Sequence, residues 1–245
     1  MSTSHSTLKP LLSILSLIAL AYGTVASATV VPVSFTHVGT VGGTGVFAAD
    51  LMGTGLSQIQ SVKVTDNNGG TAGASGIFSG FDLDALFLDA DGNLATTGDQ
   101  SFASSFLFTA GSTRPTVDPT LLPNAAHPGP TFGSLNASTV DLATATLNAF
   151  DGVSIADVNQ ANGFLTLGDG GVLTAIFAPP VGFSGSIFLM AGEVGDNGEG
   201  LDAVVTVSDT LQVPEPGSLS IVGLGLLLIG FAALRRRNSR AFGRS

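Results

Sequence analysis

The chain has 245 residues, a net charge of −10, 33 glycines and no cysteine. Seventeen of its 18 acidic residues lie between residues 29 and 213, where Lys63 and Arg114 are the only basic residues, so this part has a net charge of −15. This charge excludes nucleic acid as a partner, because phosphate binding needs clustered Lys and Arg, and the missing cysteine excludes thiol catalysis.

The N-terminal segment has the three parts of a secretory signal peptide. Lys9 gives a basic start, residues 11–21 form an apolar run, and Ala26-Ser27-Ala28 provides a small-x-small cleavage site. The run is too short to cross a hydrocarbon core of roughly 30 Å. We therefore predict that residues 1–28 are removed and that the mature chain begins near Thr29.

Residues 29–212 have the pattern of one all-β domain, a β-sandwich or a jelly roll. Apolar and polar residues alternate in 31–35, which predicts a half-buried strand. Denser apolar runs predict central strands at 172–178, 187–191 and 203–207. Two further sets of alternating residues are expected to share one strand face each: Phe81, Leu83, Ala85 and Phe87, opposite Asp82 and Asp84, and then Phe102, Phe106 and Phe108.

Two stretches interrupt the strand pattern. Residues 114–130 hold five of the eleven prolines, which predicts a long loop. Residues 141–150, "DLATATLNAF", permit one short helix capped by Ser138 or Thr139.

The acidic turn after the strand at 81–87 is a candidate calcium site. Asp89, Asp91 and Asn93 place oxygen ligands at alternate positions, and Asp82 and Asp84 lie on the strand that leads in. The EF-hand spacing is not met, because Leu94 and Gln100 stand where its glycine and glutamate belong. A hairpin turn whose Asp and Asn cap backbone amides is the alternative. A second acidic turn holds Glu193, Asp196, Asn197, Glu199 and Asp202.

Residues for catalysis are scarce. Only His37 and His127 remain as bases after signal removal, and no Gly-x-Ser-x-Gly motif occurs. The domain lacks tryptophan, and the one tyrosine, Tyr22, lies in the signal, so aromatic platforms for sugars are reduced to phenylalanines that we place in the core. We therefore expect no enzyme activity, although a carboxylate pair of the glycosidase type stays open.

Residues 213–245 combine three features in a fixed order. Pro214, Glu215 and Pro216 stay extended, because proline cannot sit inside a helix. An uncharged apolar segment at 218–234 spans about 25 Å as a helix, enough for a short transmembrane segment. A basic tail follows and predicts a stop-transfer signal with the domain outside. Its residues are Arg235, Arg236, Arg237, Arg240 and Arg244.

This order of features resembles the PEP-CTERM sorting signal of Gram-negative bacteria. The resemblance rests on Pro214-Glu215-Pro216, the segment 219–234 and the arginines from Arg235. It implies that an exosortase, a membrane peptidase, recognises the motif and removes the tail of an exported protein. An ordinary single-span anchor is the alternative. The segments "LTLGDGGVLTAIFAPPV" and "IFLMAGEVGDNGEGLDAVVTVSD" are similar to recurring segments of such exported proteins, and imply a secreted β-sandwich.

Together these features predict a non-enzymatic structural or adhesive protein of the cell surface or extracellular matrix. The C-terminal helix would anchor the precursor in the inner membrane, and calcium would stabilise one or two loops. Two other classes stay open, a calcium-assisted carbohydrate-binding module that retains exopolysaccharide and a secreted hydrolase.

Overall fold

The structure is a computed structural model, and it describes residues 28–67, 69–70, 72–153, 157–195 and 201–212. The signal peptide predicted at 1–28, except Ala28, and the sorting signal predicted at 213–245 lie outside the described residues. The chain divides into a unit that ends at Leu211 and a second unit from Gln212. The β-domain belongs to the first unit.

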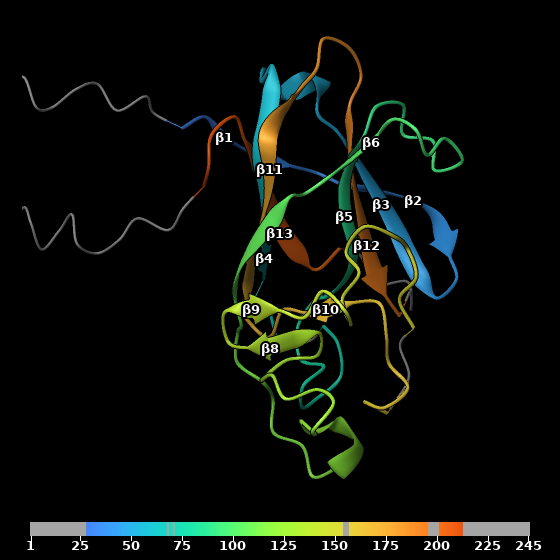
Figure 1. The fold of residues 1–245 in the computed structure, drawn as a ribbon, viewed down its shortest axis with the longest axis vertical. Coiled ribbons are helices and arrows are strands. Elements are labelled where there is room, and N and C mark those ends of the chain that lie inside the picture. The colour runs from blue at the N-terminus through green and yellow to red at the C-terminus, as the bar shows by residue number, and fades with distance from the viewer. Residues whose placement is uncertain (1–27, 68, 71, 154–156, 196–200, 213–245) are drawn as a thin grey trace, which may run out of the picture. The chain divides into compact units, whose positions relative to one another are not determined.

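Two antiparallel sheets form the β-domain, as the alternating sequence pattern predicted (Figure 1). The first sheet contains, in spatial order, β1 (Val30–Val33), β13 (Ala203–Ser208), β4 (Gln58–Asp66), β11 (Val172–Gly182) and β7 (Ser105–Thr109). The second contains β10 (Leu165–Thr166), β5 (Asp82–Asp89), β12 (Phe188–Val194), β3 (Thr44–Asp50) and β2 (Thr36–Val41), and β6 (Gln100–Phe102) also pairs with β5. The other elements are the hairpin of β8 (Ser134–Asn136) and β9 (Thr139–Val140), and the 3-10 helices Met52–Thr54 and Pro119–Leu121.

The two sheets pack face to face around one apolar core. Val62 and Leu173 of the first sheet and Leu86 and Leu189 of the second belong to this core, and all four are buried. The apolar runs predicted as central strands are β11, β12 and β13, although β11 continues four residues beyond its predicted end. The architecture is therefore a β-sandwich, because the apolar faces of both sheets remove each other from water.

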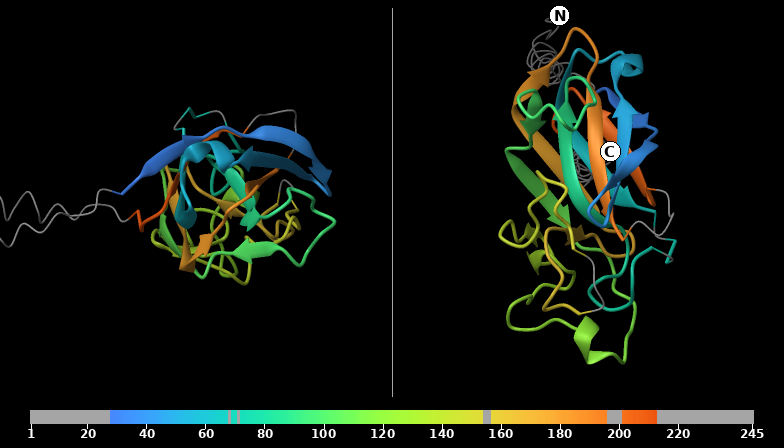
Figure 2. Two further views of the ribbon diagram at one scale, coloured as in Figure 1. Left: turned by 90° about the horizontal axis from the view of Figure 1, so that it is seen from above. Right: turned by 90° about the vertical axis from the view of Figure 1, so that its right-hand side faces the viewer.

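Long connections gather at one end of the sheets (Figure 2). They have their own small core, in which the ring of Phe132 lies 5.1 Å from that of Phe78 and 4.6 Å from that of Phe164. The proline-rich segment 114–130 is a loop, as predicted, with the 3-10 helix Pro119–Leu121 as its only regular element.

Arg114 binds two of these connections, one at residues 70–74 and the other at Asp169. Its guanidinium donates to the carbonyl oxygens of Gly70, Ala72, Gly73 and Ala74, and its Nε lies 3.6 Å from a carboxylate oxygen of Asp169. One of the two basic side chains of the domain is thus used to hold backbone in place.

A β-bulge in β5 changes the predicted faces of that strand. Leu86 pairs with Ala191 and Leu83 with Glu193, so Asp84 and Ala85 together oppose a single residue of β12. The bulge reverses the alternation of side chains. Leu83, Leu86 and Leu88 point into the main core, whereas Ala85 and Phe87 join Val46 and Met190 in a cluster of their own. The prediction that Ala85 and Phe87 share a face with Leu83 is therefore wrong.

The predicted face of Phe102, Phe106 and Phe108 is also wrong, because the chain changes sheets within it. Phe102 belongs to β6 in the second sheet and is 45% exposed, whereas Phe106 and Phe108 belong to β7 in the first. Only Phe108 is a buried member of the main core, with Phe106 partly buried against it.

The helix considered for residues 141–150 does not form. Asp141 O accepts from Thr144 N and Ala145 N, which closes one turn. The chain then turns away at Leu147, which has a φ of 29°, and Leu147 O accepts from Leu86 N of β5 at 3.0 Å. Thr146 N, the next donor that a helix would use, donates instead to Gly163 O at 3.3 Å.

Candidate metal centre and sorting signal

The candidate metal centre lies in the loop between β5 and β6. Asp89, the last residue of β5, is fully buried, and its Oδ1 accepts from Asp91 N at 3.1 Å and from Gly92 N at 2.6 Å. This pattern closes a tight turn, and Gly92 takes a positive φ of 71° within it. The Asx residues thus cap backbone amides, as in the hairpin-turn alternative.

The next two Asx side chains repeat this local pattern. Asp91 Oδ1 accepts from Asn93 N at 2.8 Å, and Asn93 Oδ1 accepts from Ala95 N at 3.2 Å. Each carboxylate or amide keeps its second side-chain atom for other contacts. Asp89 Oδ2 also accepts from Gln100 Nε2 at 3.5 Å, so the loop is ordered by its own side chains.

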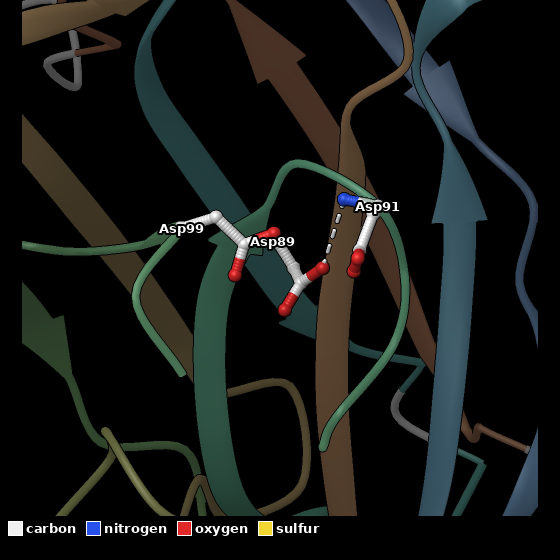
Figure 3. Close-up of side chains that lie close together, drawn as sticks. All are labelled: Asp89, Asp91 and Asp99. Carbon is white, nitrogen blue, oxygen red and sulfur yellow. Dashed lines mark hydrogen bonds between the residues drawn. The ribbon is translucent and has the colours of Figure 1, made fainter. Parts of the chain in front are cut away.

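Asp99, at the end of the loop, completes an acidic cluster with Asp89 and Asp91 (Figure 3). Each of the three offers one carboxylate oxygen, and these oxygens lie within 4.8 Å of one another. Asp99 Oδ1 is buried and has no hydrogen-bond partner among the described residues. Sequence analysis missed Asp99, because only the pairing of Asp89 with Gln100 folds the end of the loop back onto its start.

The cluster suits a hard divalent cation. Ca²⁺ takes six to eight oxygen ligands and tolerates irregular geometry, so three carboxylates would leave room for water or backbone carbonyls. Of the two basic residues between residues 29 and 213, Arg114 is bound to Asp169 and Lys63 lies in β4 of the other sheet. A bound cation would therefore relieve repulsion that neither of these two side chains relieves.

Asp82 and Asp84, which were predicted to join this site, lie at the opposite end of β5. Asp84 lies five positions before Asp89, which corresponds to roughly 16 Å along a strand. Asp82 accepts from Thr166 Oγ1, and Asp84 accepts from Thr44 Oγ1 at 2.5 Å and from Asp151 N at 3.3 Å. The structure thus places them in a different environment from the cluster.

The pKa of Asp84 departs from its ordinary value. Burial raises the pKa of Asp84 from 3.8 to about 6, against the opposing effect of hydrogen bonds from Thr44, Gly152 and Asp151. Its neighbourhood is tight, since a Cβ on Gly152 would lie 2.9 Å from Asp84 Cγ. Asp84 is therefore a buried acid under the loop at 150–152, held by hydrogen bonds from hydroxyl and amide donors.

The second acidic turn is described only in part. Glu193 is buried near the end of β12, and Asp202 accepts a hydrogen bond from the amide of Asn67. Asp196, Asn197 and Glu199 lie outside the described residues. No geometry for a cation follows from this turn.

Neither histidine belongs to a metal-binding group within the described residues. The His37 ring lies 5.2 Å from that of Phe47, and the His127 ring lies 4.8 Å from that of Phe132. Both imidazoles therefore pack on aromatic rings.

A groove of about 290 Å³ opens beside β6. Its lining combines apolar and polar side chains: Phe102, Phe106, Leu142, Thr146, Leu147 and Asn148, with Ala103. The Phe102 ring lies 5.6 Å from that of Phe87, and the side chain remains 45% exposed. The expectation that the phenylalanines all face the core is wrong at this position.

The proposed sorting residues Pro214, Glu215 and Pro216, the segment 218–234 and the arginines from Arg235 lie outside the described residues. Within the residues that are described, no helix has the length and apolar character needed to cross a bilayer.

Comparison with known proteins gives one match. No curated protein and no solved structure matches the chain. The family model of the PEP-CTERM protein-sorting motif matches residues 212–237, which include the Pro-Glu-Pro motif, the apolar segment and the first three arginines. This motif implies an exported protein that an exosortase processes, and in the sequence it follows an acidic β-sandwich.

Proposed function

We propose that this protein is a non-enzymatic structural or adhesive component of the cell surface or extracellular matrix. The observation that carries the proposal is the PEP-CTERM motif at residues 212–237. After its removal the remaining protein would be an acidic β-sandwich, released from the inner membrane or retained at the surface.

The chemistry of the domain supports a structural role. Its buried acids organise backbone: Asp66 accepts from Phe81 N and Gly170 N, and Asp89 accepts from two amides of its own turn. The histidines pack on phenylalanine rings. A divalent cation at Asp89, Asp91 and Asp99 would add rigidity to the loop that joins β5 to β6.

The test is the intact mass of the protein recovered from the cell surface and the medium. We expect a mass that lacks residues 1–28 and everything beyond the Pro-Glu-Pro region. A triple variant, Pro214→Ala, Glu215→Ala and Pro216→Ala, should still be exported but keep its arginine tail in the membrane fraction.

Leu211→Ala, just outside the matched residues, is the control and should be processed normally. Normal processing of the triple variant would refute the sorting step. The structural role has a separate test. If the protein is sorted correctly but its deletion leaves matrix mass and cell adhesion unchanged, the structural role alone is refuted.

The groove beside β6 favours a second candidate, a carbohydrate-binding module. A sugar ring stacks on an aromatic face, and Phe102 presents one next to the polar Asn148. Retention on exopolysaccharide that is lost in Phe102→Ala, but kept in Leu107→Ala at a similarly exposed position of β7, would support this candidate.

A further inference from the structure

The first and last strands of the described chain are neighbours in the first sheet. β1 is the edge strand, and it pairs antiparallel with β13 so that Val30 lies opposite Ser208. Figure 1 shows the blue start of the described chain beside its orange end. The next pair in this register is Thr29 with Asp209, and Thr29 N donates to Asp209 Oδ1 at 3.2 Å. A carboxylate therefore lies against the backbone nitrogen of the residue at which we expect the mature chain to begin.

Signal removal changes the charge of that nitrogen. Hydrolysis of the peptide bond between Ala28 and Thr29 adds one water, whose hydroxyl goes to the carbonyl carbon of Ala28 and whose proton goes to the nitrogen of Thr29. The carboxyl proton then passes to the new amine, because an α-amino group has a pKa of about 7.7–8.0 and is mostly protonated at neutral pH. The neutral amide donor beside Asp209 thus becomes an ammonium at the same atom.

The end of β13 is held in place independently of this charge. Three hydrogen bonds fix the backbone there: Gln58 Nε2 to Asp209 O at 3.2 Å, Ser61 Oγ to Thr210 O at 2.7 Å, and Thr210 N to Ser208 Oγ at 3.2 Å. Two of the donors belong to β4, the next strand of the sheet. The carboxylate of Asp209 is therefore already positioned when the ammonium forms.

The charge balance of the domain favours an ion pair at this position. Residues 29–213 contain seventeen acidic side chains and two basic ones, and β1 itself contains no charged residue. Lys63 on β4 pairs with Thr206, three positions before Asp209 and roughly 10 Å away along the strand. The other charged groups of these strands, Asp66 and Asp202, lie at the opposite end of the β4–β13 pair. The new ammonium would thus lie closer to Asp209 than Lys63 does.

We propose that removal of the signal creates an ion pair between the Thr29 α-ammonium and the Asp209 carboxylate, which holds edge strand β1 on the end of β13. The inference rests on the removal of residues 1–28 that the proposed function assumes. β1 has only four residues, so one added contact at its start is a large part of what holds it. Pro214, the first residue of the sorting motif, follows Asp209 by five positions, so the mature N-terminus would bind the chain just before that motif.

The lysine content of the chain allows a direct test. Lys9 leaves with the signal, so the exported protein has two amines, the α-amine of Thr29 and the ε-amine of Lys63. Trace acetic anhydride acetylates only the neutral form of an amine, so the acetylation rate measured across the neutral and alkaline pH range gives the pKa of each. The processed protein is recovered from the cells that export it, and the two acetylated peptides are quantified by mass spectrometry after proteolysis. Lys63 serves as the internal reference.

Asp209→Asn should lower the pKa of the Thr29 α-amine by about 0.5, because an opposite charge nearby favours the charged form and an exposed ion pair has a modest effect. At pH 7 this change corresponds to roughly threefold faster acetylation. Asp50→Asn removes the same charge from β3 of the other sheet and should leave the pKa of Thr29 unchanged. Salt at about 1 M should abolish most of the difference between Asp209→Asn and the wild type, since screening then acts within about 3 Å.

A second variant covers the case in which Asp209→Asn does not fold. One glycine inserted between Ala28 and Thr29 keeps the amide of Thr29 beside Asp209 but moves the ammonium one residue away. The pKa of the N-terminal amine should then fall in the same direction, although the hydrogen bond from Thr29 N is kept. A role of Asp209 in backbone structure alone would not produce this change.

Three results would overturn the proposal: a mature chain that does not begin at Thr29, equal pKa values of the α-amine in the wild type and in the variants at the pair, or an equal decrease in Asp50→Asn. None of these results depends on whether the C-terminal tail is removed. Failure of this proposal is thus distinguishable from failure of the sorting proposal.

Discussion

Replacing Asp84 with asparagine should stabilise the protein at alkaline pH. Asp84 is fully buried on β5, and burial raises its pKa from 3.8 to about 6, while Thr44, Gly152 and Asp151 donate hydrogen bonds to its carboxylate. Each unit of pKa difference between the folded and unfolded states corresponds to about 1.4 kcal/mol. Ionisation of this side chain therefore lowers the free energy of unfolding by about 3 kcal/mol relative to the protonated form.

The sign of the pH dependence follows from the raised pKa. The contribution of Asp84 to stability is fully present below the unfolded pKa of 3.8 and is lost as the pH rises through about 6. An asparagine side chain at this position would stay neutral throughout and keep an oxygen acceptor for Thr44. We expect Asp84→Asn to match the wild type near pH 4 and to exceed it by about 1–3 kcal/mol at pH 8.

Urea denaturation of the full-length proteins at pH 4, 5, 6, 7 and 8 measures this difference directly. Asp118→Asn is the control, because Asp118 is exposed and its pKa is lowered by hydrogen bonds from Thr120, so that variant should gain no stability at pH 8. A constant difference between Asp84→Asn and wild type across this pH range would refute the reasoning. So would a variant that is less stable than wild type at pH 8.

Three other predictions concern the loops and the bulge. Calcium should raise the Tm of the wild type by a few degrees, because a ligand that binds the folded state stabilises it. Asp99→Asn should reduce this rise, whereas Asp50→Asn, outside the cluster, should keep it. An unchanged Tm in differential scanning calorimetry would count against a cation at this cluster. Gly192→Ala should destabilise the domain by about 1–3 kcal/mol, because a Cβ would lie 2.8 Å from the Phe150 ring and 2.9 Å from Thr44 Cγ2. The control is Gly185→Ala, whose Cβ would meet nothing within 4 Å, and it should be nearly neutral in the same urea titrations. Arg114→Lys should lower the free energy of unfolding by about 2–4 kcal/mol, because one ammonium cannot bind all four carbonyl oxygens and Asp169. Hydrogen exchange of the backbone amides of residues 72–80 should become faster. Wild-type stability in Arg114→Lys would show that the carbonyl contacts contribute little.

The site illustrates what local sequence can and cannot indicate. Asp89, Asp91 and Asn93 were recognisable as a turn because each side chain acts on amides two or three residues away. Asp99 gave no such signal, since its place beside Asp89 depends on the pairing of β6 with β5. Asp82 and Asp84 looked like neighbours of the turn, but an extended strand carries them away from it.

Residue types and their spacing indicated the class of fold, the strands with strong alternation or dense apolar runs, the acidic character and the sorting motif. These properties are local, because each depends on residue types within a short window or on a sum over the chain. Tertiary structure alone decided the face of Phe87, the exposure of Phe102 and the end of the turn at Leu147. All three involve strand β5. Gly192 lacks a Cβ, which would lie 3.0 Å from Asp84 Cβ in the bulge. β6 pairs with β5, and Leu86 N donates to the carbonyl of Leu147. Hydrogen bonds between residues distant in the chain set the register there, and no pattern within either segment specifies which partner it will meet.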